Sequence, residues 1–248
     1  MNRRRPAVLV EMVIVALVSL LFVRLHAAVG TSRTAAIANA RHLQSVEGTL
    51  HLNVELTANR WLVEHPALIQ PAVYWYRLYY VVLLGVLVWV YVRHPEAYRQ
   101  VRRALVAMAL LVLPVYWALP MMPPRFASPG VVDIVAEHEL FAGAASRDLS
   151  NGENHFSAMP SMHVGWSAWC AYAVWFALRR THPRSALLAW AFPLVMTAVV
   201  LTTGNHYVLD IVGSAALLAI AVGVAALAGR LVGARSERAR PVRHGEAA

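Results

Sequence analysis

The 248-residue chain is 59% hydrophobic and only 14% charged, and several apolar runs are long enough to span a membrane, which excludes an ordinary soluble domain. The formal net charge of +9 comes from arginine alone, because the chain contains no lysine. The arginines lie between the apolar runs, so membrane topology explains this charge better than nucleic-acid binding does, and the single cysteine, Cys170, excludes an internal disulfide and a multi-cysteine metal site.

The first expected element is a membrane span within residues 1–29. Arg3, Arg4 and Arg5 precede an apolar run from residue 7 to 23, and the regions of a signal peptide follow the same order. The run is long for a signal peptide, however, and no clean small-residue cleavage site follows it. The sequence therefore favours a retained span.

Residues 30–71 are expected to form an extracytoplasmic amphipathic helical segment. Alanine, leucine and valine recur there at helical spacing between charged residues, a pattern typical of helices that lie on a membrane surface. We expect this segment to pack as a cap over the bundle rather than to bind a ligand. Pro66 and Pro71 mark the entry to the next span, and the aromatic residues that follow are interpreted as an interfacial belt, not as a ligand cage.

Residues 72–230 are expected to hold a five-span catalytic bundle, which makes the fold an all-α bundle of six transmembrane helices. These five spans are expected at residues 72–92, 104–120, 160–179, 186–202 and 206–229. The long outer loop 121–159 is too long for a turn and is a candidate functional loop. Residues 231–248 are a basic, polar tail that is expected to be disordered.

The arginines also predict the orientation. Most of them lie before residue 6, in the loops at 93–103 and 179–184, and after residue 229. Arginine-rich segments stay in the cytoplasm, so we expect a multi-pass protein of the cell membrane with both termini cytoplasmic. The span ends that carry Arg125, His163 and His206 then face outward, and an active site built from them is extracytoplasmic.

His206 and Asp210 lie four residues apart, where one apolar run ends and the next begins. On a helix these positions share a face, so Asp210 can accept a hydrogen bond from one ring nitrogen of His206 and leave the other nitrogen free. An ionisable pair within a span is costly unless it is used. His206 is therefore a candidate nucleophile or base, and Asn205 before it is a candidate helix cap.

His163 follows a second expected helix start. Proline is favoured at the first helical position, so Pro160 is expected to open the span and to leave the N–H groups of Ser161, Met162 and His163 pointing outward. Free N–H groups at a helix start form an anion site that suits phosphate, and Arg125 can neutralise further negative charge.

Each of these residues has a simpler explanation. Taken alone, His163 fits an interfacial histidine and Arg125 fits a headgroup contact. A metal site made of His163, His206 and Asp210 is a further alternative, but helix starts together with an arginine suit an anion better than a cation.

The motifs resemble those of the type 2 phosphatidic acid phosphatase superfamily, which run Lys-x6-Arg-Pro, Pro-Ser-Gly-His and Ser-Arg-x5-His-x3-Asp. The stretch 160–163 matches the second motif except for Met162 in place of glycine, His206 and Asp210 match the end of the third, and Arg125 stands for the arginine of the first. The family's other positions are held here by Ala118 for lysine, Phe126 for proline and Val199-Val200 for Ser-Arg.

Two phosphate-binding cations of the family pattern are thus absent, and the thinned pattern is most similar to the branch that includes inositol phosphorylceramide synthases. The outer-side residues that are candidates to replace those cations are Arg147, His155, Asn154 and Arg60.

The resemblance implies a lipid phosphate phosphatase or phosphotransferase that needs no metal and no other cofactor. His206, oriented by Asp210, is expected to attack phosphorus and form a phosphohistidine, while His163 protonates the leaving alcohol and later deprotonates the acceptor. The expected phosphate-binding residues are Arg125, Ser161, Met162, Asn205, Arg147 and His155. The expected partners are a membrane lipid phosphate and a water or alcohol acceptor, with no nucleic acid; the sequence gives no oligomeric state. Transfer of an inositol-phosphoryl headgroup between lipids, or a catalytically silent phospholipid-binding protein, remain the alternatives.

Overall fold

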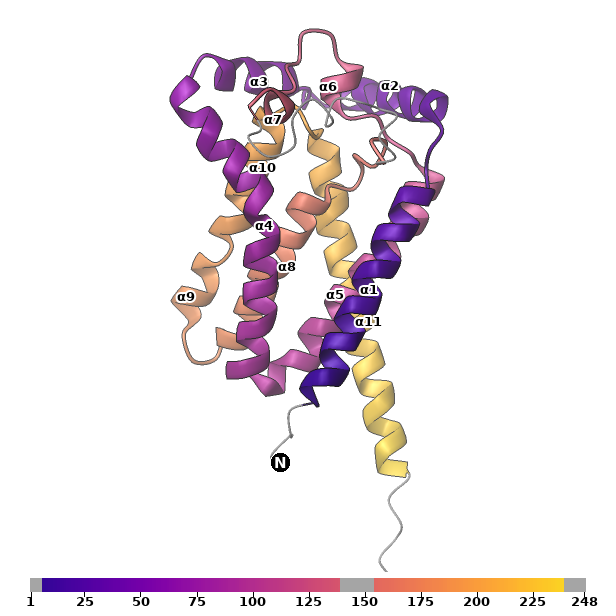
Figure 1. Cartoon of the computed structure of the whole chain (residues 1–248), viewed down its shortest axis with the longest axis vertical. Coiled ribbons are helices and arrows are strands. Elements are labelled where there is room, and N and C mark those ends of the chain that lie inside the picture. Colours follow the sequence, from indigo (N-terminus) through magenta and orange to yellow (C-terminus); the bar gives the residue numbers. More distant parts are fainter. Residues whose placement is uncertain (1–5, 139–153, 239–248) are drawn as a thin grey trace, which may run out of the picture.

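The computed structural model describes residues 6–138 and 154–238, and every regular element within them is a helix. The expectation of an all-α fold is confirmed for this part of the chain. The longer helices stand side by side as a bundle (Figure 1). They are α1 (Val8–Ala28), α4 (Pro66–Arg93), α5 (Pro95–Ala118), α8 (Met162–Leu178), α10 (Ala191–Thr202) and α11 (Val208–Arg238). The remaining helices are α2 (Arg33–Thr49), α3 (Glu55–Val63), α6 (Pro124–Ala127), α7 (Ile134–Glu137) and α9 (Pro183–Leu188).

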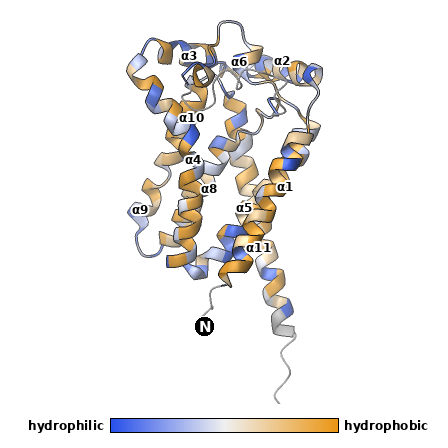
Figure 2. Ribbon diagram, viewed as in Figure 1, coloured by the Kyte–Doolittle hydropathy of each residue, from blue (hydrophilic) through white to orange (hydrophobic). Residues whose placement is uncertain are grey.

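Five segments of the described chain are long and apolar enough to cross a membrane. They are α1, α4, α5, the α9–α10 stretch and most of α11. Their outward surfaces carry many exposed leucine and valine side chains, and the bundle is strongly hydrophobic along its length (Figure 2). Such surfaces are stable against lipid tails, so the chain has the construction of a multi-pass membrane protein.

The remaining expected span, at residues 160–179, corresponds to α8, which has 17 residues. At 1.5 Å per residue it is ~26 Å long, slightly short of a hydrocarbon core of about 30 Å. α8 is enclosed by other helices, and most of its side chains are buried. The six-span count stays a prediction.

Small residues allow α8 to occupy the centre of the bundle. A Cβ atom at Gly165 would lie 2.8 Å from Cε of Met108 on α5, so glycine permits this close approach. The indole of Trp169, which is fully buried, donates to the carbonyl of Val101 at 3.0 Å. These contacts fix the position of α8, and His163 lies in its first turn.

α2 and α3 lie across one end of the bundle, and both contain polar residues (Figures 1 and 2). The buried residues of α2 recur at helical spacing and are Ala36, Ala40, Leu43 and Glu47, which is the pattern of an amphipathic helix. The start of α1 and the end of α11 lie at the opposite end of the bundle.

α4 begins earlier than the span expected at residue 72. Pro66 occupies its first turn and Pro71 lies inside it. Proline is tolerated in a first turn, where its missing N–H has no helical partner. The two prolines that were expected to mark the entry to the span are thus part of the helix itself. The segment before the helix is therefore shorter than residues 30–71.

Candidate active site

A cavity of about 270 Å³ opens at the end of the bundle where α6 and α7 lie. It brings together residues that are far apart in the sequence: Arg125, His163, Asn205 and His206 all line it. Met162, Asn154 and His155 line it as well. Ser161 and Asp210 are completely buried behind these residues.

His206 is held through one ring nitrogen. Its Nδ1 lies 3.2 Å from Oδ2 of Asp210 and 2.9 Å from the carbonyl oxygen of Ala158. Both partners are acceptors, so Nδ1 carries the proton and Nε2 is left with its lone pair. This is the tautomer that a nucleophilic histidine requires.

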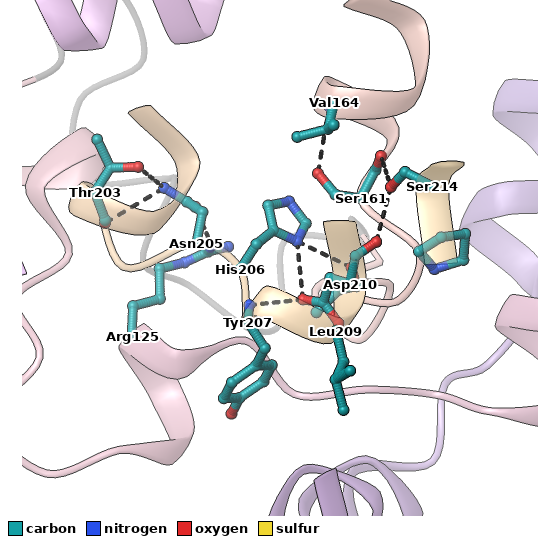
Figure 3. A network of polar contacts seen from close by, with 12 residues as sticks. Arg125, Ser161, Val164, Thr203, Asn205, His206, Tyr207, Leu209, Asp210 and Ser214 are labelled. Carbon is teal, nitrogen blue, oxygen red and sulfur yellow. Dashed lines mark hydrogen bonds and ion pairs between the residues drawn. The ribbon is translucent and has the colours of Figure 1, made fainter. Parts of the chain in front are cut away.

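The contact between His206 and Asp210 is made differently from the expected pairing on one helix face. His206 lies before α11, whereas Asp210 lies in the first turn of that helix. Oδ2 of Asp210 reaches back to accept the N–H of Tyr207 at 2.9 Å as well as the His206 contact (Figure 3). The pair is therefore part of a helix N-terminal cap, and Asn205 is not the cap that the sequence led us to expect.

The starts of α8 and α11 are bound to each other. The N–H of Ser161 donates to the carbonyl of Asp210 at 3.2 Å. The hydroxyl of Ser214 lies 2.7 Å from the carbonyl of Ser161 and 2.8 Å from that of Asp210 (Figure 3). The two catalytic candidates thus stand on two helix starts that are directly hydrogen-bonded.

This arrangement corrects the expected anion site. Pro160 does not open α8; Ser161 precedes the helix, and its hydroxyl accepts the N–H of Val164 at 3.4 Å. Because the Ser161 N–H is already bonded to Asp210, it is not available to substrate. The N–H groups of Met162 and His163 have no hydrogen-bond partner among the described residues.

His163 faces the cavity from a stack of aromatic rings. Its imidazole lies parallel to the ring of Tyr76, with centroids 3.9 Å apart, and meets the ring of Tyr79 at 4.7 Å. The centroids of His163 and His206 are 6.1 Å apart. One group bound between them is within reach of both histidines.

Arg125 is fixed beside the turn that leads into α11. Its guanidinium contacts Oδ1 of Asn205 (Figure 3), its Nε lies 3.3 Å from Oδ2 of Asp133, and its backbone N–H donates to the carbonyl of Gly204 at 2.9 Å. Gly204 has φ +74, and a Cβ there would lie 2.6 Å from Cγ1 of Val131, so the turn requires glycine. Asn205 therefore contacts Arg125 as well as lining the cavity, and its expected direct contact with phosphate stays a prediction.

A family model described as PAP2 superfamily matches residues 41–224 of the chain. The chain belongs to the PAP2 superfamily. Its members are generally phosphatases or phosphotransferases. Nothing among the curated proteins or the solved structures matches the chain. The closer similarity to the inositol phosphorylceramide synthase branch stays a prediction.

The residues that differ from the PAP2 motifs lie in surroundings that suit their own side chains. Val199 and Val200, at the positions of Ser-Arg, are buried in an apolar cluster. The ring of Phe126, at the proline position, lies 4.7 Å from Cζ of Arg125 and contributes a cation–π contact. Ala118, Val199 and Val200 do not line the cavity. The positive charge that the family motifs have at two of these positions is therefore missing from the cavity.

The four residues suggested as replacements for these cations differ in whether they line the cavity. Arg147 lies outside the described residues, and Arg60 of α3 does not line the cavity. His155 lines it. The amide of Asn154 donates to the carbonyls of His26 and Val29 at 2.9 and 2.7 Å, so it holds the loop against the end of α1.

Sequence reasoning missed several residues of this PAP2 cavity. They are His26, Tyr76, Arg77, Tyr79 and Asp133. The tyrosines were interpreted as an interfacial belt, yet two of them pack on His163. One signal was available: an arginine inside an apolar span is costly and commonly functional, and Arg77 is such a residue.

The three side chains of the alternative metal site do not converge on one point in the described part of the chain. Asp210 contacts Nδ1 of His206 and the N–H of Tyr207 instead of converging with His163. Within residues 6–138 and 154–238, no cluster of three or more histidine, cysteine or acidic side chains is placed to hold a metal ion.

Proposed function

We propose that this protein is an integral membrane phosphatase or phosphotransferase that acts on a phosphorylated lipid through a phosphohistidine at His206. The observation that carries the proposal is the pair of acceptors at Nδ1 of His206, Asp210 and Ala158, which leaves Nε2 as the reactive nitrogen. His163 and Arg125 line the same cavity, and family membership makes phosphoryl chemistry the expected reaction.

The proposed reaction has two displacements at phosphorus. Nε2 of His206 forms a bond to phosphorus while the bond to the lipid oxygen breaks, and His163, which takes up a proton when the phosphate anion binds, gives that proton to the leaving alcohol. His163 then takes a proton from water or an alcohol, whose oxygen attacks phosphorus as the P–N bond breaks. Arg125 and the N–H groups of Met162 and His163 stabilise the added negative charge of each transition state.

A second cavity supports a lipid as the substrate. It is an apolar groove of about 230 Å³ between α1, α4, α5 and α8, and it shares Phe22, Tyr79 and Trp166 with the catalytic cavity. Its further lining is mostly aliphatic, including Val18, Leu83 and Leu87. An acyl chain attached to a phosphate between the two histidines fits this groove, whereas a soluble phosphate ester does not need it.

The proposed location is the extracytoplasmic side of the cell membrane. The cavity lies at the end of the bundle opposite to the start of α1 and the end of α11 (Figure 1). The arginine distribution favours cytoplasmic termini, which directs the cavity outward.

Headgroup transfer between lipids is the second candidate. Beside the histidines, the catalytic cavity presents further polar groups from Asp133, Asn154, His155 and Ser157. Such groups suit the hydroxyls of an alcohol acceptor, such as an inositol-containing headgroup. A catalytically silent phospholipid binder is the less favoured alternative, because the nucleophile, its orienting carboxylate and the second histidine are all in place.

The test is turnover of phosphorylated lipids by the purified protein in detergent. We expect the wild type to release phosphate from phosphatidic acid or to exchange a phosphoryl headgroup with an added alcohol, and an acid-labile phosphoprotein to form. His206→Ala should abolish all three signals, whereas His182→Ala, an exposed histidine outside the cavity, should leave them unchanged. Near-normal turnover by His206→Ala would refute the nucleophile, and inactivity of the wild type on all lipids would favour the silent binder.

A further inference from the structure

Arg77 is a cation of the catalytic cavity that comes from a helix outside the three family motifs. It lies well inside α4, where most neighbouring residues are apolar or aromatic. Its side chain lines the cavity together with Arg125 of α6. The two guanidinium groups therefore reach one cavity from different parts of the fold.

The surroundings of Arg77 place its charge beside the catalytic histidine. Its Cζ lies 5.8 Å from the ring centroid of Tyr76, and that ring stacks on His163 at 3.9 Å. Arg77 and Arg125 both line the cavity that His163 faces. A phosphoryl group bound between His163 and His206 lies within the field of both arginines.

One arginine alone is a poor match for this reaction. Arg125 is ion-paired with Asp133 at 3.3 Å, so part of its charge is already neutralised. A phosphate monoester carries up to two negative charges, and a pentavalent transition state needs stabilisation at several oxygens at once. The positions where the PAP2 pattern has its other two cations are held by Ala118 and Val200, which do not line the cavity.

We infer that Arg77 binds the phosphoryl group of the substrate and supplies, from α4, the positive charge that the family motifs lack in this chain. The inference rests on the proposed function, because it assigns a ligand within the same cavity. A guanidinium contacts two phosphate oxygens through its planar fork. The role is one of charge stabilisation, and no proton moves to or from Arg77.

The test compares Arg77→Met with Arg60→Met, a control arginine of α3 that does not line the cavity. Methionine keeps an unbranched apolar side chain in place of the aliphatic part of arginine and removes the charge. For release of phosphate from phosphatidic acid in detergent, we expect Arg77→Met to lower kcat/KM about 100-fold or more, as the loss of one charge-stabilising group does. Arg60→Met should stay within about threefold of the wild type, and Arg77→Lys should recover part of the loss because it restores the charge.

A binding measurement separates a direct contact from a structural role. Orthovanadate is used as the probe, and the shift that it causes in the unfolding temperature is recorded. We expect the shift in the wild type and in Arg60→Met, and its loss in Arg77→Met, whose unfolding temperature without vanadate stays near that of the wild type. If Arg77→Met does not fold, Arg77→Gln is judged by the same two measurements.

The outcomes separate the two proposals. An active wild type together with normal kcat/KM and a normal vanadate shift in Arg77→Met overturns the inference and leaves the proposed function standing. A wild type that is inactive on every lipid counts against the proposed function. In that case the vanadate shift alone decides whether Arg77 binds an anion: loss of the shift in Arg77→Met supports the inference, and its persistence overturns it.

Discussion

Two acceptors meet at Nδ1 of His206, and they differ in kind. The carbonyl of Ala158 belongs to the backbone of the outer loop, whereas Oδ2 of Asp210 belongs to a fully buried side chain that also accepts the N–H of Tyr207. The carbonyl is neutral and the carboxylate is charged. In the proposed reaction, only the carboxylate stabilises the positive imidazole that forms when Nε2 bonds to phosphorus.

Asp210→Asn tests whether the charge of the carboxylate, and not the neutral carbonyl of Ala158, stabilises the positive imidazole. The amide keeps an oxygen for the N–H of Tyr207, and Ala158 still accepts from Nδ1, so the fold and the tautomer are retained. The charge opposite the imidazole is lost, and we expect kcat for phosphate release to fall about 100-fold or more. The measurement is single-turnover formation of phosphohistidine, and a formation rate equal to that of the wild type would show that Asp210 acts only as a helix cap.

The residues of the candidate site could be proposed from the sequence, but the contacts that hold them in place could not. Histidines and a carboxylate at helix starts form a local pattern, so His163, His206 and Asp210 could be found from spacing. The contacts of His206 with Ala158 and of Ser161 with Asp210 join segments that are distant in the sequence. Such contacts depend on how helices pack, and no local pattern encodes them. Arg77 was overlooked for a different reason, because its aromatic neighbours resemble an interfacial belt.

At the scale of elements, α2 holds the start of α11 in place. Oε1 of Glu47 on α2 accepts the N–H of Leu209 at 2.6 Å, in the same turn that carries Asp210. Oε2 of Glu47 and Oε1 of Glu55 have no hydrogen-bond partner among the described residues. The pKa of the Glu47 carboxyl is raised to about 8, chiefly by burial and further by the neighbouring Glu55 carboxyl. At neutral pH the carboxyl of Glu47 is therefore mostly protonated.

The amphipathic character of α2 was predictable from its spacing, but this function was not. A glutamate in an amphipathic helix is ordinarily assigned to the solvent face, and Glu47 instead occupies the buried face with Ala36, Ala40 and Leu43. Only the position of α11 beneath α2 makes that burial favourable. The helix described as a cap is thus also part of the support of the candidate site.

The raised pKa of Glu47 gives the fold a pH dependence. The folded protein keeps a proton that the unfolded chain releases above the ordinary value of 4.5. The stabilisation from this group is complete below pH 4.5 and is lost as the pH rises through about 8. We expect the unfolding temperature in detergent to fall over this range.

Glu47→Gln isolates the effect, because it keeps an acceptor for the Leu209 N–H and cannot ionise, so its unfolding temperature should decline less steeply. Glu64→Gln, an exposed residue after α3, serves as the control and should follow the wild type. Glu47→Ala removes the cap itself and should cost about 1 kcal/mol at low pH, where the stabilisation from Glu47 is complete, and less as the pH rises through about 8. Identical pH profiles for the wild type and Glu47→Gln would contradict the assignment of this dependence to Glu47.

At the scale of the whole molecule, α1 is an integral part of the bundle. Glu11 in its first turn pairs with Arg102 and accepts the hydroxyl of Tyr98 at 2.9 Å. At its other end, Nε2 of His26 lies 3.0 Å from Oγ of Ser157 in the outer loop. These contacts favour the retained span over the signal peptide. The sequence showed Glu11 only as a carboxylate in an apolar run, because its partners lie on another helix.

The groove beside α1 leads us to expect that this helix contributes to substrate selection, and Ser19→Trp tests this prediction. Ser19 lines the apolar groove, and an indole there fills the space proposed for an acyl chain. We expect kcat/KM for a long-chain phosphatidic acid to fall about tenfold, equivalent to ~1.4 kcal/mol and within the usual cost of overpacking an apolar site.

Hydrolysis of dihexanoyl phosphatidic acid or p-nitrophenyl phosphate should be unaffected, because neither needs the full length of the groove. Leu17→Trp is the matched control, since Leu17 lies on the exposed face of α1 outside the groove. An equal loss on long-chain and short substrates would mean that the indole disturbs the catalytic cavity through the shared residues Phe22 and Trp166. Selective loss of the long-chain activity would instead place the acyl chain between α1 and α4 and make the first helix a determinant of lipid specificity.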